Sequence, residues 1–351
     1  MRGYLYRIVA GRQGGALAAV IKSALFILSL VYGIIIRVLI FGSSFVQKRF
    51  NLRIISVGNI TVGGTGKTSL VELISRYLKG RGNSLAILTR GYKRKGLDYA
   101  GDEPRMLAKN LEDTPVIIDK NRARSARRAV REYNCDTAIL DDGFQQWHIK
   151  KDLDIVVIDS LNPFGNRHML PRGLLREPLS SLKRGDIFVL SKTNFVSRGD
   201  LDKIRLSLVK YNPRGLIVES IHKPVGFYNI KEPGKLLSLV CLKKEKVVLL
   251  SGIGDPVSFL KTISGLGVGV GLELVFSDHH YYTVREIEVI ADRARRSGLK
   301  FIVTTEKDAA RISEEAISIL GDLEILILRI ELKIVKNEEP FFNRLLGLYS
   351  L

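Results

Sequence analysis

A glycine-rich segment carries the residue types that hold a nucleotide phosphate. Residues 59–69 read NITVGGTGKTS. Glycines let the backbone turn its N–H groups onto an anion, a following lysine reaches the β and γ phosphates, and the next hydroxyl can ligate Mg²⁺. The usual pattern G-x-x-x-x-G-K-[ST] is met except at its first position, which is Thr61. The expected phosphate-binding residues are Gly63, Gly64, Thr65, Gly66, Lys67, Thr68 and Ser69.

An acidic pair supplies oxygen ligands for the Mg²⁺ that accompanies a nucleotide. Residues 137–141 read TAILD, and Asp141 and Asp142 close this apolar run before Gly143. A buried strand that ends on acids next to a phosphate loop is where such a metal is held. The plainer interpretation is an ordinary turn after a strand, where Asp-Gly is common. With the phosphate loop present, the sequence favours the metal site.

Further side chains distinguish a kinase from a GTPase. The Asp-Asp-Gly at 141–143 is one residue short of D-x-x-G, and SKTN at 191–194 lacks the first and last residues of N-K-x-D. A kinase also needs a group that accepts or orients the proton of an acceptor hydroxyl. The candidates are Asp102 and Glu103 in GDEP, and Asp278 and His279 in SDHH. Arg90, just after an apolar run, is suited to contact a phosphate. Each of these motifs also occurs in helix starts and surface turns.

Short apolar runs alternating with amphipathic stretches must position these residues. The expected strands of the first part are 54–58, 85–89, 116–119, 137–141, 155–159 and 187–191, with helices at 69–79 and 122–133. Runs of Val, Ile and Leu without strict alternation indicate strands buried on both faces. The pattern predicts an α/β fold: a mostly parallel sheet, like that of P-loop NTPases, with helices on both faces.

A second α/β unit is expected after a linker. Extended segments at 215–221 and 236–241 precede strands at 247–251, 273–276, 301–305 and 323–328. The predicted organisation has five parts, which are a hydrophobic anchoring helix in 1–50, a phosphate-loop core in 51–214, a β-type linker in 215–245, a smaller α/β domain in 246–330, and a return strand with a C-terminal helix in 331–351.

The net charge of +19 on the 351-residue chain is concentrated at its N-terminal end. Residues 1–71 contain nine Lys or Arg and no acid, whereas residues 132–351 are close to neutral. The basic region includes the apolar stretch 15–46, whose longest uncharged run, 23–36, is shorter than the roughly 20 residues of a membrane span. We expect a helix that lies on an anionic leaflet, with a true span or a buried core helix as alternatives.

This distribution argues against a nucleic-acid partner, which would require basic residues and stacking aromatic side chains spread over a binding face. The chain has one Trp. Its two cysteines exclude a disulfide framework.

Taken together, the motifs resemble those of the tetraacyldisaccharide 4'-kinases of lipid A synthesis. The resemblance rests on the basic apolar N-terminal helix and on the following segments, in order: SVGNITVGGTGKTS at 56–69, LTRGY at 88–92, GDEP at 101–104, LDDGFQ at 140–145, DLDIVVID at 152–159, FGNRHMLPRGLLREP at 164–178, SDHH at 277–280 and TTEKDA at 304–309. The chain differs in having Gln146 where the family usually has His, and Ser69 where it usually has Pro.

The resemblance implies two α/β/α units joined by a β linker. It implies transfer of the ATP γ-phosphoryl group, with Mg²⁺, to the 4'-hydroxyl of an acylated glucosamine disaccharide 1-phosphate at the cytoplasmic face of the inner membrane. Asp102 would be the catalytic base, assisted by His279. Asp141, Asp142 and Glu177 would serve the metal with Thr68, and supporting contacts would come from Arg90, Glu103, Arg122, Gln145 and Asp278. The alternative function is a membrane-associated P-loop ATPase or GTPase that acts as a switch or chaperone.

Overall fold

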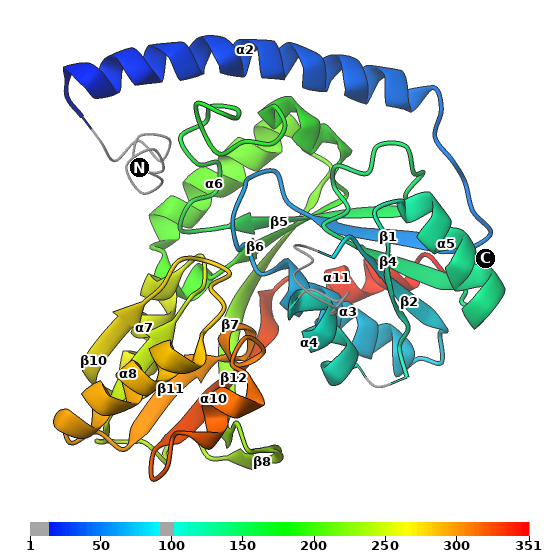
Figure 1. The fold of residues 1–351 in the computed structure, drawn as a ribbon. Helices are drawn as coiled ribbons and strands as arrows, with labels where there is room; N and C mark the ends of the chain where they lie inside the picture. Colours follow the sequence, from blue (N-terminus) through cyan, green and yellow to red (C-terminus); the bar gives the residue numbers. More distant parts are fainter. Residues whose placement is uncertain (1–13, 92–101, 112, 351) are drawn as a thin grey trace. The chain divides into compact units, whose positions relative to one another are not determined.

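The computed structural model describes residues 14–91, 102–111 and 113–350 and divides into two compact units (Figure 1). Unit 1 comprises residues 1–91, 111–221 and 333–351, and unit 2 comprises residues 92–110 and 222–332. Two long strands, β7 (Leu216–Asn229) and β12 (Glu324–Lys336), run from one unit into the other. Helix α4 (Asp102–Asn110) groups with unit 2, whereas the sequence pattern predicts it within the core, 51–214.

Unit 1 is built on a parallel sheet. Its strands lie in the order β7-β6-β5-β1-β4-β2-β3, and each neighbouring pair is parallel. The strands besides β7 are β1 (Arg53–Gly58), β2 (Leu85–Thr89), β3 (Val116–Ile118), β4 (Thr137–Asp141), β5 (Leu153–Asp159) and β6 (Ile187–Ser191). The helices are α2 (Ala16–Ser44), α3 (Lys67–Lys79), α5 (Arg122–Tyr133), α6 (Arg198–Tyr211) and α11 (Glu338–Leu346), with 3-10 turns η1 (Leu179–Arg184) and η2 (Thr193–Phe195).

The continuous apolar runs explain this sheet. Every residue of β2, β4 and β6 is buried, as expected of strands covered on both faces. Leu201, Ile204 and Leu208 of α6 pack on β5 and β6, while Ala126 and Ala129 of α5 pack beside β2 and β4. The predicted α/β class and mostly parallel sheet are confirmed.

Helix α2 presents most of its apolar side chains to the outside. It spans 29 residues, or about 43 Å at 1.5 Å per residue, and its segment Leu17–Ser44 is long and apolar enough to cross a membrane. Ile27 and Ile34 are 63% and 62% exposed, so the buried-helix alternative is wrong. One side contacts the segment before β6: the Tyr32 hydroxyl donates a hydrogen bond to the Arg176 carbonyl at 2.9 Å, and the Phe26 ring meets that of His168 edge-on.

Unit 2 is a smaller α/β unit. Strands β9 (Lys246–Ser251), β10 (Gly269–Val275), β11 (Phe301–Thr305) and β12 form a parallel set in the order β10-β9-β11-β12, and β8 (Glu232–Leu237) pairs antiparallel with β7. The helices, besides α4, are α7 (Pro256–Gly265), α8 (Val284–Arg296), α9 (Glu306–Ala309) and α10 (Glu314–Ser318). A capping box of Thr283 and Glu286 starts α8, whose apolar face covers the sheet.

The linker strands differ from their predicted limits. The sequence predicts extended segments at 215–221 and 236–241, whereas β7 continues to Asn229 and β8 begins at Glu232. The expectation of a strand over 236–241 is therefore wrong beyond Leu237. The reason is a turn at 230–231 that folds the chain back on itself, so that Phe227 and Tyr228 pair with Leu237 and Leu236. A turn without the usual Gly or Pro signal is hard to place from sequence.

Candidate functional site

The phosphate loop connects β1 to α3 at the carboxyl edge of the unit 1 sheet. Gly63 and Gly66 have φ values of 124° and 91°, a region that favours glycine. Helix α3 begins at Lys67, two residues earlier than predicted, so its first backbone N–H groups belong to the loop. The N-terminal end of a helix attracts anions. The exposed turn at 62–64 and the free helix end together form an anion cradle.

Lys67 crosses the mouth of this loop. Its Nζ lies 3.1 Å from Asn59 Oδ1 and 3.4 Å from Asp142 Oδ1. The Asn59 side chain also donates a hydrogen bond to the Thr61 carbonyl at 2.7 Å. The lysine ammonium is therefore held between the end of β1 and the acid that follows β4, where a bound phosphate would meet it.

Strand pairing brings the acidic pair beside the loop. In the parallel register of β1 and β4, Asp141 lies opposite Val57, and Asp142 follows with φ 54°. Arg176 Nη1 lies 3.0 and 2.8 Å from the two carboxylate oxygens of Asp142. Burial by itself would raise the pKa of Asp142, but the Lys67 ammonium and the Arg176 guanidinium outweigh it, so the pKa lies below its usual value.

Asp141 and Arg122 form the next part of the site. Asp141 is buried, and its Oδ2 accepts a hydrogen bond from Thr89 Oγ1 at 3.2 Å. Arg122 opens α5 and donates to the backbone carbonyls of Asp119, at 2.6 Å, and Asp141, at 3.3 Å. Burial lowers the pKa of Arg122 to about 10, although Asp141 and Asp142 oppose the shift. Arg122 thus ties the start of α5 to the end of β4.

Glu177 lies under the loop with both carboxylate oxygens engaged. Its side chain is fully buried, and Arg184 Nη2 lies 2.7 Å from Oε2. Oε1 accepts hydrogen bonds from Gln145 at 3.1 Å and from Trp147 at 3.0 Å. Gln145 also donates to the Asn59 carbonyl at 3.0 Å. Glu177 and Gln145 therefore brace the phosphate loop from below.

Sequence reasoning gave no role to Asn59, Trp147, Arg176 and Arg184. Arg176 stands in the LREP segment quoted for the resemblance, and Asn59 directly follows the strand. Their roles depend on contacts between distant segments, so only the position of Asn59 next to the loop offered a local signal. Arg90 lies exposed after β2.

The remaining predicted residues belong to unit 2. Asp278 and His279 lie in the turn after β10, about half-exposed, with His279 Nε2 3.8 Å from Asp278 Oδ2. Helix α4 begins at Asp102, but the side chains of Asp102 and Glu103 lie outside the described residues.

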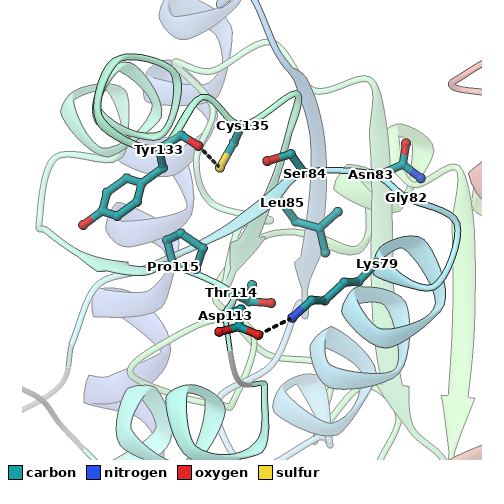
Figure 2. Close-up of a pocket in the computed structure, with 10 residues that line it drawn as sticks. All are labelled: Lys79, Gly82, Asn83, Ser84, Leu85, Asp113, Thr114, Pro115, Tyr133 and Cys135. Carbon is teal, nitrogen blue, oxygen red and sulfur yellow. Dashed lines mark hydrogen bonds and ion pairs between the residues drawn. The ribbon is translucent and has the colours of Figure 1, made fainter.

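A hollow of about 390 Å³ lies at the opposite edge of the unit 1 sheet, where β2, β3 and β4 begin (Figure 2). It is lined by Lys79, Gly82, Asn83, Ser84, Leu85, Asp113, Thr114, Pro115, Tyr133 and Cys135. None of the predicted site residues lines it, and ligands of open parallel sheets bind at the carboxyl ends of the strands. We therefore place the candidate site at the phosphate loop.

A phosphate loop between a strand and a helix, with acids closing the neighbouring parallel strand, defines a nucleotide-binding protein of the P-loop class. The model of the family "Tetraacyldisaccharide-1-P 4'-kinase" matches residues 21–349. A tetraacyldisaccharide 4'-kinase of Halothermothrix orenii is 35% identical, covering 95% of this chain and 94% of its own length. One of Anaeromyxobacter dehalogenans (strain 2CP-C) is 36% identical over 82% of this chain and 79% of its own.

A solved structure gives the same result. The crystal structure of LpxK from Aquifex aeolicus in complex with ATP matches with a TM-score of 0.71 and 26% identity, covering 94% of this chain and all of that one. The chain belongs to the tetraacyldisaccharide-1-phosphate 4'-kinase family, and it is a phosphate-transferring enzyme. This assignment confirms the resemblance and favours the kinase over a switch ATPase or GTPase.

Proposed function

We propose that the phosphate loop binds ATP and that the chain transfers the γ-phosphoryl group to the 4'-hydroxyl of a tetraacyldisaccharide 1-phosphate, which gives lipid IVA. The observation that carries this proposal is the placement of Lys67, 3.1 Å from Asn59 and 3.4 Å from Asp142 at the mouth of the loop, in a chain of this family. The backbone N–H groups of residues 63–69 hold the β and γ phosphates, and the Lys67 ammonium offsets their charge.

The oxygen donors beside the loop fit Mg²⁺, which prefers hard oxygen ligands. Among the described residues, no group of three or more His, Cys, Asp or Glu side chains converges on one point. Thr68 and Asp141 would hold the ion, with Asp142 beside them. When bound, Mg²⁺ neutralises charge on the phosphates. Glu177 supports this site indirectly, because both its oxygens are already engaged.

In the transfer step the 4'-oxygen forms a bond to the γ-phosphorus while the bond to the β–γ bridging oxygen breaks, which leaves ADP. The hydroxyl proton passes to the Asp102 carboxylate, and His279 assists through a hydrogen bond. Glu103 and Asp278 support these two residues, while Arg90 and Arg122 support the phosphate side. The long strands β7 and β12 link the core to the smaller domain, and the C-terminal helix α11 belongs to the core.

The lipid substrate requires an enzyme that reaches a membrane. Helix α2 exposes its apolar side chains, and the nine basic residues of 1–71, with no acid among them, suit an anionic surface. We propose that α2 anchors the chain to the cytoplasmic face of the inner membrane, lying in the leaflet interface with the disaccharide at the level of the headgroups.

The proposal is tested by incubating the purified full chain with γ-labelled ATP, Mg²⁺ and tetraacyldisaccharide 1-phosphate in vesicles. We expect label in the lipid product, and a Lys67→Ala variant that loses at least about 100-fold of this transfer. Lys79→Ala, a lysine at the far end of the same helix, should transfer like the wild type. Labelled free phosphate without labelled lipid would contradict the proposal and favour an ATPase.

A further inference from the structure

A buried ion pair lies behind the turn that carries His279. The side chains of Asp308 and Arg311 are fully buried, with Arg311 Nη1 3.3 Å from Asp308 Oδ1. Asp308 also accepts hydrogen bonds from the Gly252 N–H at 3.0 Å, the Tyr282 hydroxyl at 3.2 Å and Thr305 Oγ1 at 2.8 Å. A buried charge pair is tolerated when its polar atoms are satisfied in this way.

The two arms of the Arg311 guanidinium reach different partners. Nη1 donates to the Gly252 carbonyl at 2.9 Å, and Nη2 lies 3.2 Å from His279 Nδ1. The His279 backbone N–H donates to the same Gly252 carbonyl at 3.1 Å. Gly252 has no room for a side chain, because an added Cβ would lie 2.9 Å from the Tyr282 hydroxyl oxygen. The turn that carries the His279 imidazole is thus held by buried groups, namely the Arg311 guanidinium and the Gly252 carbonyl.

Hydrogen-bond chemistry decides the state of the ring. A guanidinium has five N–H donors and no acceptor, so His279 Nδ1 must be the unprotonated, accepting nitrogen. In a neutral imidazole the proton then sits on Nε2, on a side chain that is 39% exposed. His279 also has φ 62°, in the left-handed region that a non-glycine residue adopts at a cost and that is often found at functional positions.

The neighbouring histidine has a different environment. The His280 ring packs at a tilt against the Phe276 ring, with centroids 4.6 Å apart, and meets the Tyr282 ring edge-on at 5.1 Å. Its Nε2 lies 3.1 Å from Glu286 Oε1, the carboxylate of the α8 capping box. His280 therefore serves the packing of this corner, and it offers a matched control for His279.

We propose that Arg311, held in place by Asp308, is a positioning residue that fixes His279 as the Nε2–H tautomer, so that His279 acts in phosphoryl transfer as a hydrogen-bond donor and not as the proton acceptor. This inference rests on the proposed kinase function, in which His279 assists the transfer. In this scheme the proton of the acceptor hydroxyl passes to a carboxylate, and the Nε2–H of His279 orients an oxygen in the site.

The tautomer is measured directly by ¹⁵N NMR of the full chain labelled at its five histidines. The His279 signals, assigned by their loss in His279→Asn, should show a protonated Nε2 and an unprotonated Nδ1 near neutral pH. Arg311→Lys keeps the charge opposite Asp308 but cannot donate to both partners, so it should give mixed tautomers and lower kcat about 10-fold with KM for ATP unchanged. His280→Gln should leave the His279 pattern and the transfer rate as they are.

A second pair of variants tests whether His279 acts as a hydrogen-bond donor. Because His279 is about half-exposed, its substitution does not endanger folding. In His279→Gln the side-chain amide N–H can stand in for Nε2–H, whereas in His279→Asn the amide reaches only the Nδ1 position. We expect the Gln variant to retain at least about 10-fold more transfer. Equal loss in both variants, or a protonated Nδ1 in the wild type, would overturn the inference. A wild type without lipid phosphorylation would instead overturn the proposed function, while the tautomer would still be read from the spectrum.

Discussion

Arg176 Nη1 contacts both carboxylate oxygens of Asp142, at 3.0 and 2.8 Å. The backbone carbonyl of the same residue accepts the hydrogen bond from Tyr32 of α2. Arg176 therefore contacts both the acid beside the phosphate loop and the exposed apolar helix. The Asp142 carboxylate also lies 3.4 Å from Lys67 Nζ, so the arginine and the lysine share it.

Replacing Arg176 by Met should alter the response of the enzyme to acid. The pKa of Asp142 is lowered in the folded chain, so its contribution to stability is present above the unfolded pKa and is lost as the pH falls through the folded one. Urea unfolding of the wild type should therefore show a loss of stability below about pH 4 that is smaller in Arg176→Met. Arg214→Met, at an exposed position in unit 1, should behave like the wild type, and an identical acid response in Arg176→Met would refute this account.

Asp102→Asn tests the assignment of the base. The amide cannot take a proton, so lipid phosphorylation should fall by about 100-fold or more, while ATP affinity measured by equilibrium binding stays within about 2-fold. Asp113→Asn, whose side chain is 92% exposed, should retain full transfer. Wild-type transfer by Asp102→Asn would remove Asp102 from this role.

Substitutions of two acids near the phosphate loop should differ in their effect on the Mg²⁺ concentration that transfer requires. Asp141→Asn should raise the Mg²⁺ concentration needed for half-maximal transfer, because it weakens a metal ligand. Glu177→Gln should leave that concentration unchanged but lower the free energy of unfolding by about 3 kcal/mol or more, because it breaks the buried pair with Arg184. A raised Mg²⁺ requirement in Glu177→Gln would make Glu177 a ligand after all.

Acidic substitutions on the exposed side of α2 should weaken membrane binding. Ile27→Asp combined with Ile34→Asp places two charges on an apolar surface, so less protein should float with phosphatidylglycerol-containing vesicles in a density gradient. Leu206→Asp on α6, where the side chain is 71% exposed, is the matched control and should float normally. Deletion of residues 1–46 should move the chain to the soluble fraction. Unchanged flotation of the double variant would show that another surface binds the membrane.

The phosphate loop could be predicted because the residues that form it are adjacent in the sequence. The phosphate loop, the lysine and the hydroxyl occupy adjacent positions between one strand and one helix, and the apolar runs that became β2, β4 and β6 are buried as their composition indicates. Parallel pairing then obliges the end of β4 to lie beside the end of β1, so the position of Asp141 next to the loop follows from the sequence pattern.

The phosphate loop, the α/β class and the family could be read from the sequence alone, because these depend on short patterns and their order. The interaction partners of the buried charged residues became visible only in the folded chain. Glu177 meets Trp147 from 30 residues away, Arg311 meets His279 from 32, and Arg176 meets Asp142 from 34. Such contacts arise where separate segments pack together, and no local pattern encodes them. For this reason the sequence could not show that Glu177 is engaged by Gln145, Trp147 and Arg184, or that His279 and His280 have different partners.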